Sequence, residues 1–248
     1  MADMDVAVRA EGISLTGDEG KVFGPLDFTI PNQGLTSLLG SGGSGRTALA
    51  LVLSGRMKIT DGELEVLGMT KHSKIQKRVA IAGVDQIDFL DRSVKVKDVL
   101  TENKAWQKLW IQPVKKATEE DLENFCGYVY GDRSLPPLDA YISQLTNLDK
   151  LLIRISLALQ PAHGTPAEML VMDDLEQVRE QGDRQVLLHI LERISRDIPV
   201  VVNSVNPIDT ITPVETIELD TNLGHAIPEV TGDEDGYGMK QSTEGDQE

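Results

Sequence analysis

The 248-residue chain has little cysteine and comparatively few basic residues, and each shortage excludes a class of protein. A single cysteine, Cys126, rules out an internal disulfide and fits a reducing compartment. It lies in "LENFCGYVYG" with no histidine cluster nearby, so we interpret it as a packing residue rather than a nucleophile. Lys and Arg number 24 against 40 Asp and Glu, a formal net charge of −16. This excess of acids argues against sequence-independent nucleic-acid binding and against electrostatic docking on anionic lipid.

Long apolar runs are missing as well. The N-terminal stretch "MADMDVAVRAEG" lacks the apolar segment of a signal peptide. No run approaches the roughly 18 to 20 apolar residues of a membrane span. We therefore expect no direct membrane insertion, so that any membrane role passes through a partner. The last residues, 231–248, hold six acids and one lysine, which predicts a disordered acidic tail after one folded unit over 1–230.

Strand and helix patterns alternate along the rest of the chain. Up to residue 40, apolar and polar residues alternate between Gly and Pro, which is typical of an antiparallel β-layer. Residues 46–57 have helical spacing, and helical stretches with polar faces fill about 88–160, which predicts an inserted helical subdomain. The segments "AEMLVMDD" and "IPVVVNS" are continuous apolar runs, the pattern of buried parallel strands. Together these patterns predict an α/β fold with a parallel-sheet core.

The stretch "LLGSGGSGRTALALVLSG", residues 38–55, matches the pattern of a phosphate-binding loop between a strand and a helix. Arg46 stands where lysine is usual; it keeps the charge, but its planar fork changes the geometry that phosphoryl transfer needs. A glycine-rich turn that caps a helix without a ligand is the alternative. The residues that we expect to cradle phosphates, with the Thr47 hydroxyl on Mg²⁺, are Gly40, Ser41, Gly42, Gly43, Ser44, Gly45, Arg46, Thr47 and Ala48.

From this loop onward the chain resembles the nucleotide-binding subunit of ABC transporters, over roughly residues 6–222. "VAIAGVDQ" is similar to the strand that ends in that family's glutamine loop, and "MLVMDD" is similar to its Walker B strand. "ISQLTNLDKLLIRISLALQP" occupies the place of the signature and its helix. The resemblance implies a P-loop NTPase fold of ABC type with ATP and Mg²⁺ as ligands. It also implies an integral membrane partner and a second ATPase subunit, identical or different.

The resemblance assigns roles to three residues near the phosphates. Gln86 falls near the metal and the attacking water, and Asp173 falls in the metal-supporting position. A solvated loop glutamine and a strand-end acid that caps the next helix are the respective alternatives. Asp174 stands in the place of the family's general base, a glutamate, and its shorter side chain makes it a doubtful base.

Other positions depart from the family. Its LSGGQ signature is here Leu145 to Asp149, without the two glycines. We expect Asn147 and Leu148 to crowd that surface and Asp149 to turn a negative charge toward the partner's phosphate. Three further departures are Ser204 at the histidine that ends the last core strand, Glu180 at the aspartate of the dimer-contact loop, and Phe23 as the nearest candidate for the adenine-stacking aromatic.

These features predict an ATP-binding subunit of a membrane transport or export complex, with weak or absent hydrolysis, held at the cytoplasmic face of the cell membrane by its partner. A non-enzymatic regulatory or scaffold subunit is the alternative. A soluble P-loop kinase is disfavoured, because the helical insertion and the Gln86 loop follow the ABC order. Trp106 and Trp110 lie four residues apart on a predicted helix, which indicates either packing within the subdomain or a docking surface for the membrane partner.

Overall fold

A parallel β-sheet forms the centre of the molecule. The computed structural model describes residues 6–84, 87–106, 113–160 and 166–219. Five strands lie in the order β5-β6-β7-β3-β8, and each neighbouring pair is parallel. They are β3 (Leu35–Gly40), β5 (Val79–Ala82), β6 (Met169–Met172), β7 (Val200–Ser204) and β8 (Glu215–Leu219).

Both faces of this sheet are buried along β5, β6 and the first part of β7, which explains why these stretches are continuous apolar runs; β3 also buries Thr36 and Ser37, and the edge strand β8 is partly exposed. In β6, Met169 and Val171 pack into one core cluster, whereas Leu170 and Met172 pack into the other. All four side chains are fully buried. Because side chains alternate between the faces of a strand, every position must be apolar when both faces are covered. The predicted parallel-sheet core is confirmed.

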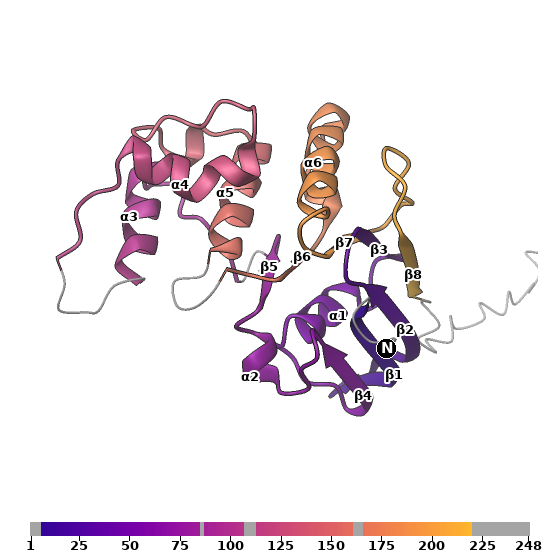
Figure 1. Cartoon of the computed structure of the whole chain (residues 1–248). Coiled ribbons are helices and arrows are strands. Elements are labelled where there is room, and N and C mark those ends of the chain that lie inside the picture. Colours follow the sequence, from indigo (N-terminus) through magenta and orange to yellow (C-terminus); the bar gives the residue numbers. More distant parts are fainter. Residues whose placement is uncertain (1–5, 85–86, 107–112, 161–165, 220–248) are drawn as a thin grey trace, which may run out of the picture.

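An antiparallel sheet and one helix cover the first face. The strands are β1 (Val6–Gly17), β2 (Gly20–Pro31) and β4 (Asp61–Val66), in the order β2-β1-β4. Helix α1 (Arg46–Leu53) contributes its buried residues to the same core cluster (Figure 1). It ends before the predicted residue 57, because Gly55 takes a left-handed conformation (φ 69°) where a side chain would collide with the His72 carbonyl.

Helices cover the second face. Figure 1 shows α3, α4 and α5 together in one lobe, with α6 beside it over the sheet. The lobe falls within the region 88–160 in which the sequence predicts an inserted helical subdomain. The elements are α3 (Val96–Trp106), α4 (Glu119–Tyr130), α5 (Asn147–Leu159) and α6 (Gln181–Ile194), with the short α2 (His72–Ile75) and the 3₁₀ turns η1 (Ile142–Gln144) and η2 (Leu175–Gln177).

Some predictions lie outside the described residues. They concern Gln86, Trp110 and the acidic tail 231–248. Among the helices that the structure describes, none has the length and apolar content needed to cross a membrane.

Cys126 is a core residue of α4, as predicted. Its side chain is fully buried, and burial raises the pKa of its thiol to about 11. We expect the folded protein not to react with a thiol reagent such as Ellman's reagent at pH 8, because the thiolate is the reactive form. The same chain in guanidinium should release one equivalent of chromophore. Complete reaction of the native protein within minutes would contradict this prediction.

Candidate functional site

The loop between β3 and α1 has the geometry of a phosphate cradle. Gly43 and Gly45 take left-handed conformations, with φ of 80° and 85°. A side chain at Gly45 would lie 2.7 Å from the Val22 carbonyl oxygen, so the loop packs tightly on that side. A side chain at Gly42 or Gly43 would meet open space. Since no side chain of the described chain caps α1, the amides of its first turn are available to an anion.

Several buried polar atoms in this part of the structure lack a hydrogen bond within the described residues. The Oγ of Ser44 is buried and lacks a hydrogen bond within the described residues, although it lies against Gly40. Buried polar groups nearly always have a partner, so such a cluster indicates a place for water, an ion or a ligand. The atoms are Ser44 Oγ, Arg46 Nε and Nη1, Glu176 Oε2 and Asn203 Oδ1.

Asp173 ends β6 at the carboxyl edge of the sheet, where the sequence predicts the metal-supporting acid. It is 4% exposed, and its Oδ1 accepts a short hydrogen bond from Nδ2 of Asn203 in β7. Its backbone amide donates to the Ala82 carbonyl at 2.8 Å. The sequence prediction missed Asn203, although a lone asparagine inside a buried apolar strand signals a structural partner.

Asp174 leads the chain out of β6 into η2. Its backbone lies in the left-handed region (φ 50°, ψ 75°), which Asp tolerates better than most residues. The residue is exposed, unlike Asp173. The two acids that are adjacent in the sequence therefore differ in burial: Asp173 is buried and Asp174 is exposed.

Arg46, the cation of the phosphate loop, faces a carboxylate of its own chain. Its Nη1 lies 4.0 Å from Oε2 of Glu176, and the two side chains are 13% and 23% exposed. The other oxygen of Glu176 accepts hydrogen bonds from the backbone amides of Val205 at 2.7 Å and Asn206 at 3.4 Å. The sequence prediction did not single out Glu176, because nothing in "MDDLEQ" distinguishes its third acid from a solvated one.

A network of hydrogen bonds and an ion pair joins this edge to the helical lobe. Arg154 of α5 pairs with Asp88 and donates to Oε1 of Gln177 at 3.0 Å. The Gln177 amide in turn donates to the carbonyls of Asp173 at 3.0 Å and Asp174 at 2.9 Å. Asp88 also accepts from the Gly83 amide at 2.8 Å. The segment after β5, the helix α5 and the end of β6 are thus linked through mostly part-buried polar contacts.

The signature region differs from the sequence expectation in two respects. Leu148 is 1% exposed and belongs to the core, so it does not crowd the outer surface. Asp149 does not turn outward: its Oδ2 accepts from the Thr146 hydroxyl at 2.7 Å, and its Oδ1 lies 3.7 Å from Arg133. The reason is local, since Thr146 is the N-cap of α5 and an acid in the first helical turn is stabilised there. Asn147 is exposed, as expected.

Three other sequence candidates have structural roles. Ser204 is fully buried, and its Oγ lies 3.4 Å from Oγ of Ser37 in β3. Phe23 is 4% exposed and packs beneath Gly45, so its ring belongs to the core rather than to an exposed stacking surface. Glu180 is the exposed N-cap residue of α6.

The residues present fit a magnesium nucleotide. Thr47 is exposed in the first turn of α1, next to the glycine loop. Over the ranges that the structure describes, no three His, Cys, Asp or Glu residues gather to hold a metal on their own. Mg²⁺ does not require such a cluster, because nucleotide phosphates and water commonly supply most of its ligands.

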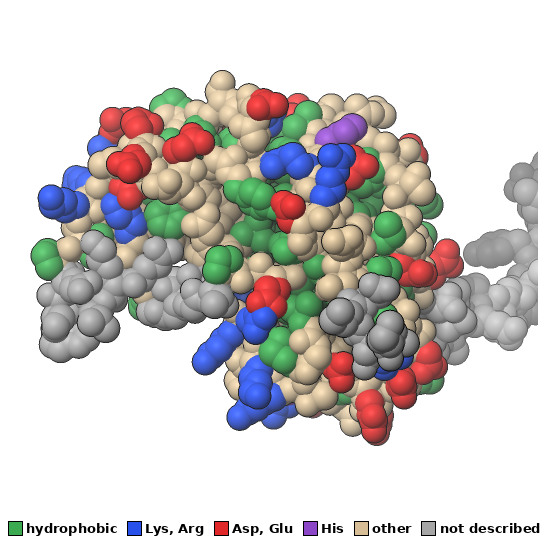
Figure 2. Space-filling view, in the orientation of Figure 1, with side chains coloured by type: hydrophobic (Ala, Val, Ile, Leu, Met, Phe, Trp, Pro, Cys, Tyr) green, Lys and Arg blue, Asp and Glu red, His purple; other side chains and the backbone are tan. Residues whose placement is uncertain are grey.

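A groove separates the helical lobe from the rest of the molecule. Its volume is about 370 Å³, and residues 87–90, α3 and α5 line it. Phe89 and Trp106 in this groove are 71% and 59% exposed, which rules out simple packing within the subdomain for Trp106. Figure 2 shows one face of the whole molecule, with hydrophobic side chains gathered near its centre. The groove therefore offers an apolar surface to a partner.

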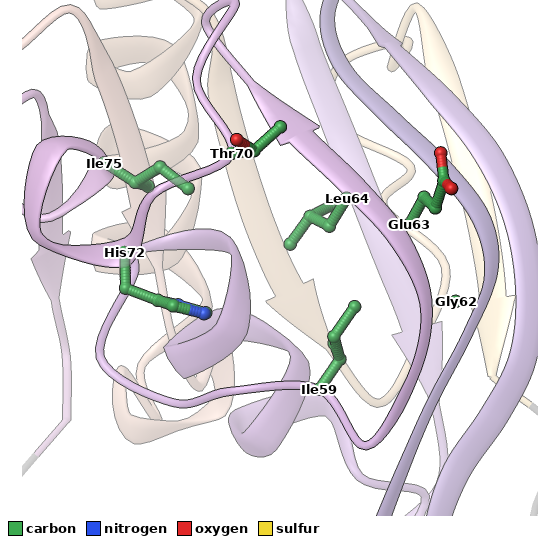
Figure 3. A pocket seen from close by; sticks show the side chains of 7 residues that line it. All are labelled: Ile59, Gly62, Glu63, Leu64, Thr70, His72 and Ile75. Atoms are coloured by element: carbon green, nitrogen blue, oxygen red, sulfur yellow. The ribbon is translucent and has the colours of Figure 1, made fainter.

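A second cavity, of about 270 Å³, lies between β4 and α2. Figure 3 shows the side chains of Ile59, Leu64 and Ile75 pointing into it, with His72 beside them and Glu63 directed away. Its lining is mainly apolar and includes none of the phosphate-loop residues.

Known proteins that resemble this chain agree with the fold and the phosphate loop described above. A model of the family described as "ABC transporter" matches residues 23–149, from within β2 through the phosphate loop to the signature region. The chain belongs to the ABC transporter family. Within it, this chain is an ATP-binding subunit, and its five-stranded parallel and three-stranded antiparallel sheets form the P-loop fold of ABC ATPases.

Several relatives resemble this ABC ATPase over most of its length. The energy-coupling factor transporter ATP-binding protein EcfA1 of Fusobacterium nucleatum is 25% identical over 203 residues, which cover 79% of this chain and 72% of that protein. A Pyrococcus furiosus chain described as an ABC transporter ATP-binding protein superposes with a TM-score of 0.64 at 16% identity, covering 86% of this chain and 96% of its own length. The cbiO1 protein of Clostridium perfringens gives a TM-score of 0.64 at 15% identity, covering 82% and 79%.

Removal of the Arg154 guanidinium should destabilise this ABC transporter ATP-binding subunit. Arg154 and Asp88 are 10% and 14% exposed, and Arg154→Met leaves a largely buried carboxylate without its ion-pair partner. We expect a loss of about 3–5 kcal/mol in the free energy of unfolding, measured by urea titration. Arg78→Met is the matched control, since Arg78 and Glu168 are both 40% exposed and such pairs contribute at most about 1 kcal/mol. Equal losses in the two variants would contradict the prediction.

Proposed function

We propose that this chain is the ATP-binding subunit of an ABC-type membrane transport or export complex, with weak or absent ATP hydrolysis. The observation that carries the binding proposal is the group of buried polar atoms that lack a hydrogen bond around an open glycine loop. A loop that only capped a helix would need neither the open side at Gly42 and Gly43 nor a largely buried arginine beside it.

In this proposal, residues 40–48 hold the phosphates through backbone amides and the α1 N-terminus. Thr47 and Gln86 would hold Mg²⁺, with Asp173 supporting them. The metal, when bound, neutralises charge on the phosphate oxygens. Asn203 fixes the orientation of the Asp173 carboxylate. The site is thus arranged for binding and for holding the metal shell.

Weak hydrolysis follows from the environment of Asp174. A general base must lie within about 3 Å of the proton that it removes or act through a water molecule. The carboxylate of Asp174 is one methylene shorter than that of glutamate, so it reaches less far toward an attacking water. Ser204, at the position of the family's histidine, is buried against Ser37 and has no access to a nucleotide. Little is left to activate the attacking water.

The apolar groove supports an integral membrane subunit as the partner. Ile87, Phe89 and Trp106 are exposed around it, and Arg154 at its base connects through Gln177 to the end of β6. A segment of the membrane subunit seated there would place this chain at the inner face of the membrane. The similar cbiO1 protein of Clostridium perfringens is part of the ABC transporter complex cbiONQ, which agrees with such a partnership.

A second ATPase subunit, identical or different, would complete each site. Because Asp149 is held by Thr146 and Arg133, its charge opposes pairing less than the sequence suggests. The absence of glycine at Asn147 and Leu148 still removes the close backbone approach that the family's signature provides.

A non-enzymatic regulatory or scaffold subunit is the second candidate function. The ion pair between Arg46 and Glu176 favours it, because the loop cation already has a partner in the protein. In that case the fold would serve as a docking platform.

We expect the protein to bind MgATP even though its ATP hydrolysis is weak or absent. We expect MgATP to bind with a dissociation constant in the micromolar to millimolar range, about −4 to −8 kcal/mol, measured by calorimetry. Thr47→Ala should weaken MgATP binding about tenfold, a loss of roughly 1.4 kcal/mol, and leave the melting temperature unchanged, because Thr47 is exposed. Absence of binding at millimolar MgATP would leave the scaffold function. A phosphate-release rate of about 1 s⁻¹ or more, within the ordinary enzymatic range, would refute weak hydrolysis.

The groove can be tested on the full chain in cells that express it. We expect Trp106→Glu to reduce the yield of the membrane protein that co-purifies from detergent-solubilised membranes, because a charge in an apolar contact is costly. Val214→Glu is the control, since Val214 is 55% exposed and does not line the groove. Equal recovery of the same membrane protein with both variants would place the interface elsewhere.

A further inference from the structure

We propose that Glu176 sets the nucleotide preference of this site, so that it accepts a nucleoside diphosphate at least as well as a triphosphate. The inference rests on the proposed nucleotide binding and adds to it a residue that the sequence pattern does not identify.

The position of the Glu176 carboxylate is the first step. In a phosphate loop, the cation at the position of Arg46 reaches the β- and γ-phosphates. Here that cation has a carboxylate 4.0 Å from Nη1. Glu176 therefore presents a negative charge on the side of the loop where the charge of the terminal phosphate would lie.

The immobility of this carboxylate is the second step. One of its oxygens accepts from the Val205 and Asn206 amides that follow β7, and these bonds hold the side chain in place. Withdrawing the Glu176 carboxylate from the site would break both of these bonds.

Two buried atoms that lack a hydrogen bond indicate that Glu176 compensates the charge of Arg46 only in part. Arg46 Nη1 and Glu176 Oε2 are both buried and form no hydrogen bond within the described part of the chain, although they attract each other across 4.0 Å. Arg46 thus retains donors for a phosphate oxygen. A diphosphate can use those donors without bringing a third phosphate against Glu176, whereas a triphosphate meets the repulsion of like charges.

The test compares MgADP and MgATP by calorimetry on the full chain. Glu176→Gln keeps an acceptor for the Val205 amide and removes only the charge. The control is Glu120→Gln, the same charge change on the exposed surface of α4 in the helical lobe. Should the glutamine variant not fold, Glu176→Ala carries the same charge change and the same expectation.

We expect the wild-type chain to bind MgADP at least as tightly as MgATP. Glu176→Gln should tighten MgATP about tenfold or more, equivalent to 1.4 kcal/mol, and MgADP by about threefold or less, so that the preference shifts toward ATP. Glu120→Gln should change neither value.

Three outcomes overturn the proposal. They are a wild-type preference for MgATP of tenfold, an ATP-to-ADP affinity ratio that Glu176→Gln leaves unchanged within twofold, or an equal shift in Glu120→Gln. Failure of every variant to bind either nucleotide would refute the proposed binding function itself, and the inference with it. Binding with an unchanged ratio would refute only the role of Glu176.

Discussion

Burial of the parallel sheet on both faces is the constraint on which the rest of the structure depends. Met169 to Met172 and Val200 to Val202 are fully buried and carry no polar side chain. The polar groups of the site lie where the strands end: the glycine loop after β3, Asp173 after β6, and Asn203 with Ser204 in the last part of β7. Because parallel strands all end at the same edge, residues more than a hundred positions apart meet there. The chemistry of this protein is confined to that edge by the composition of its core.

The charged groups named at this edge largely have contacts with other groups of the protein. Asn203 holds Asp173, Glu176 faces Arg46, and Thr146 with Arg133 holds Asp149. Each contact lowers the energy of the ligand-free site, and a ligand or partner that needs the same group must replace it. This arrangement suits a subunit that binds nucleotide and responds to partners more than one that turns over rapidly on its own.

The fold and the phosphate loop could be predicted from the sequence, because both depend on patterns within a few neighbouring residues. The apolar runs of β6 and β7, the helical spacing of α4 and the glycines around Arg46 each act within a few residues. The partners of the site residues could not be predicted in this way. Glu176 meets Arg46 from 130 positions away, and Arg154 meets Asp88 from 66. The misjudged orientation of Asp149 had a local cause that sequence does contain, since a threonine three residues before an acid is a capping pattern.

The contacts of Gln177 require an amide side chain, because one end must accept a hydrogen bond and the other must donate. Its carbonyl oxygen accepts from Arg154, while its nitrogen faces the carbonyl oxygens of Asp173, Asp174 and Gly83. Rotating the amide by half a turn would oppose donor to donor and acceptor to acceptor. Deamidation replaces the NH2 group of this side chain by an oxygen, so that a carboxylate would face three backbone carbonyl oxygens. Deamidation of this one glutamine would therefore disrupt the contacts that join the sheet edge to the helical lobe.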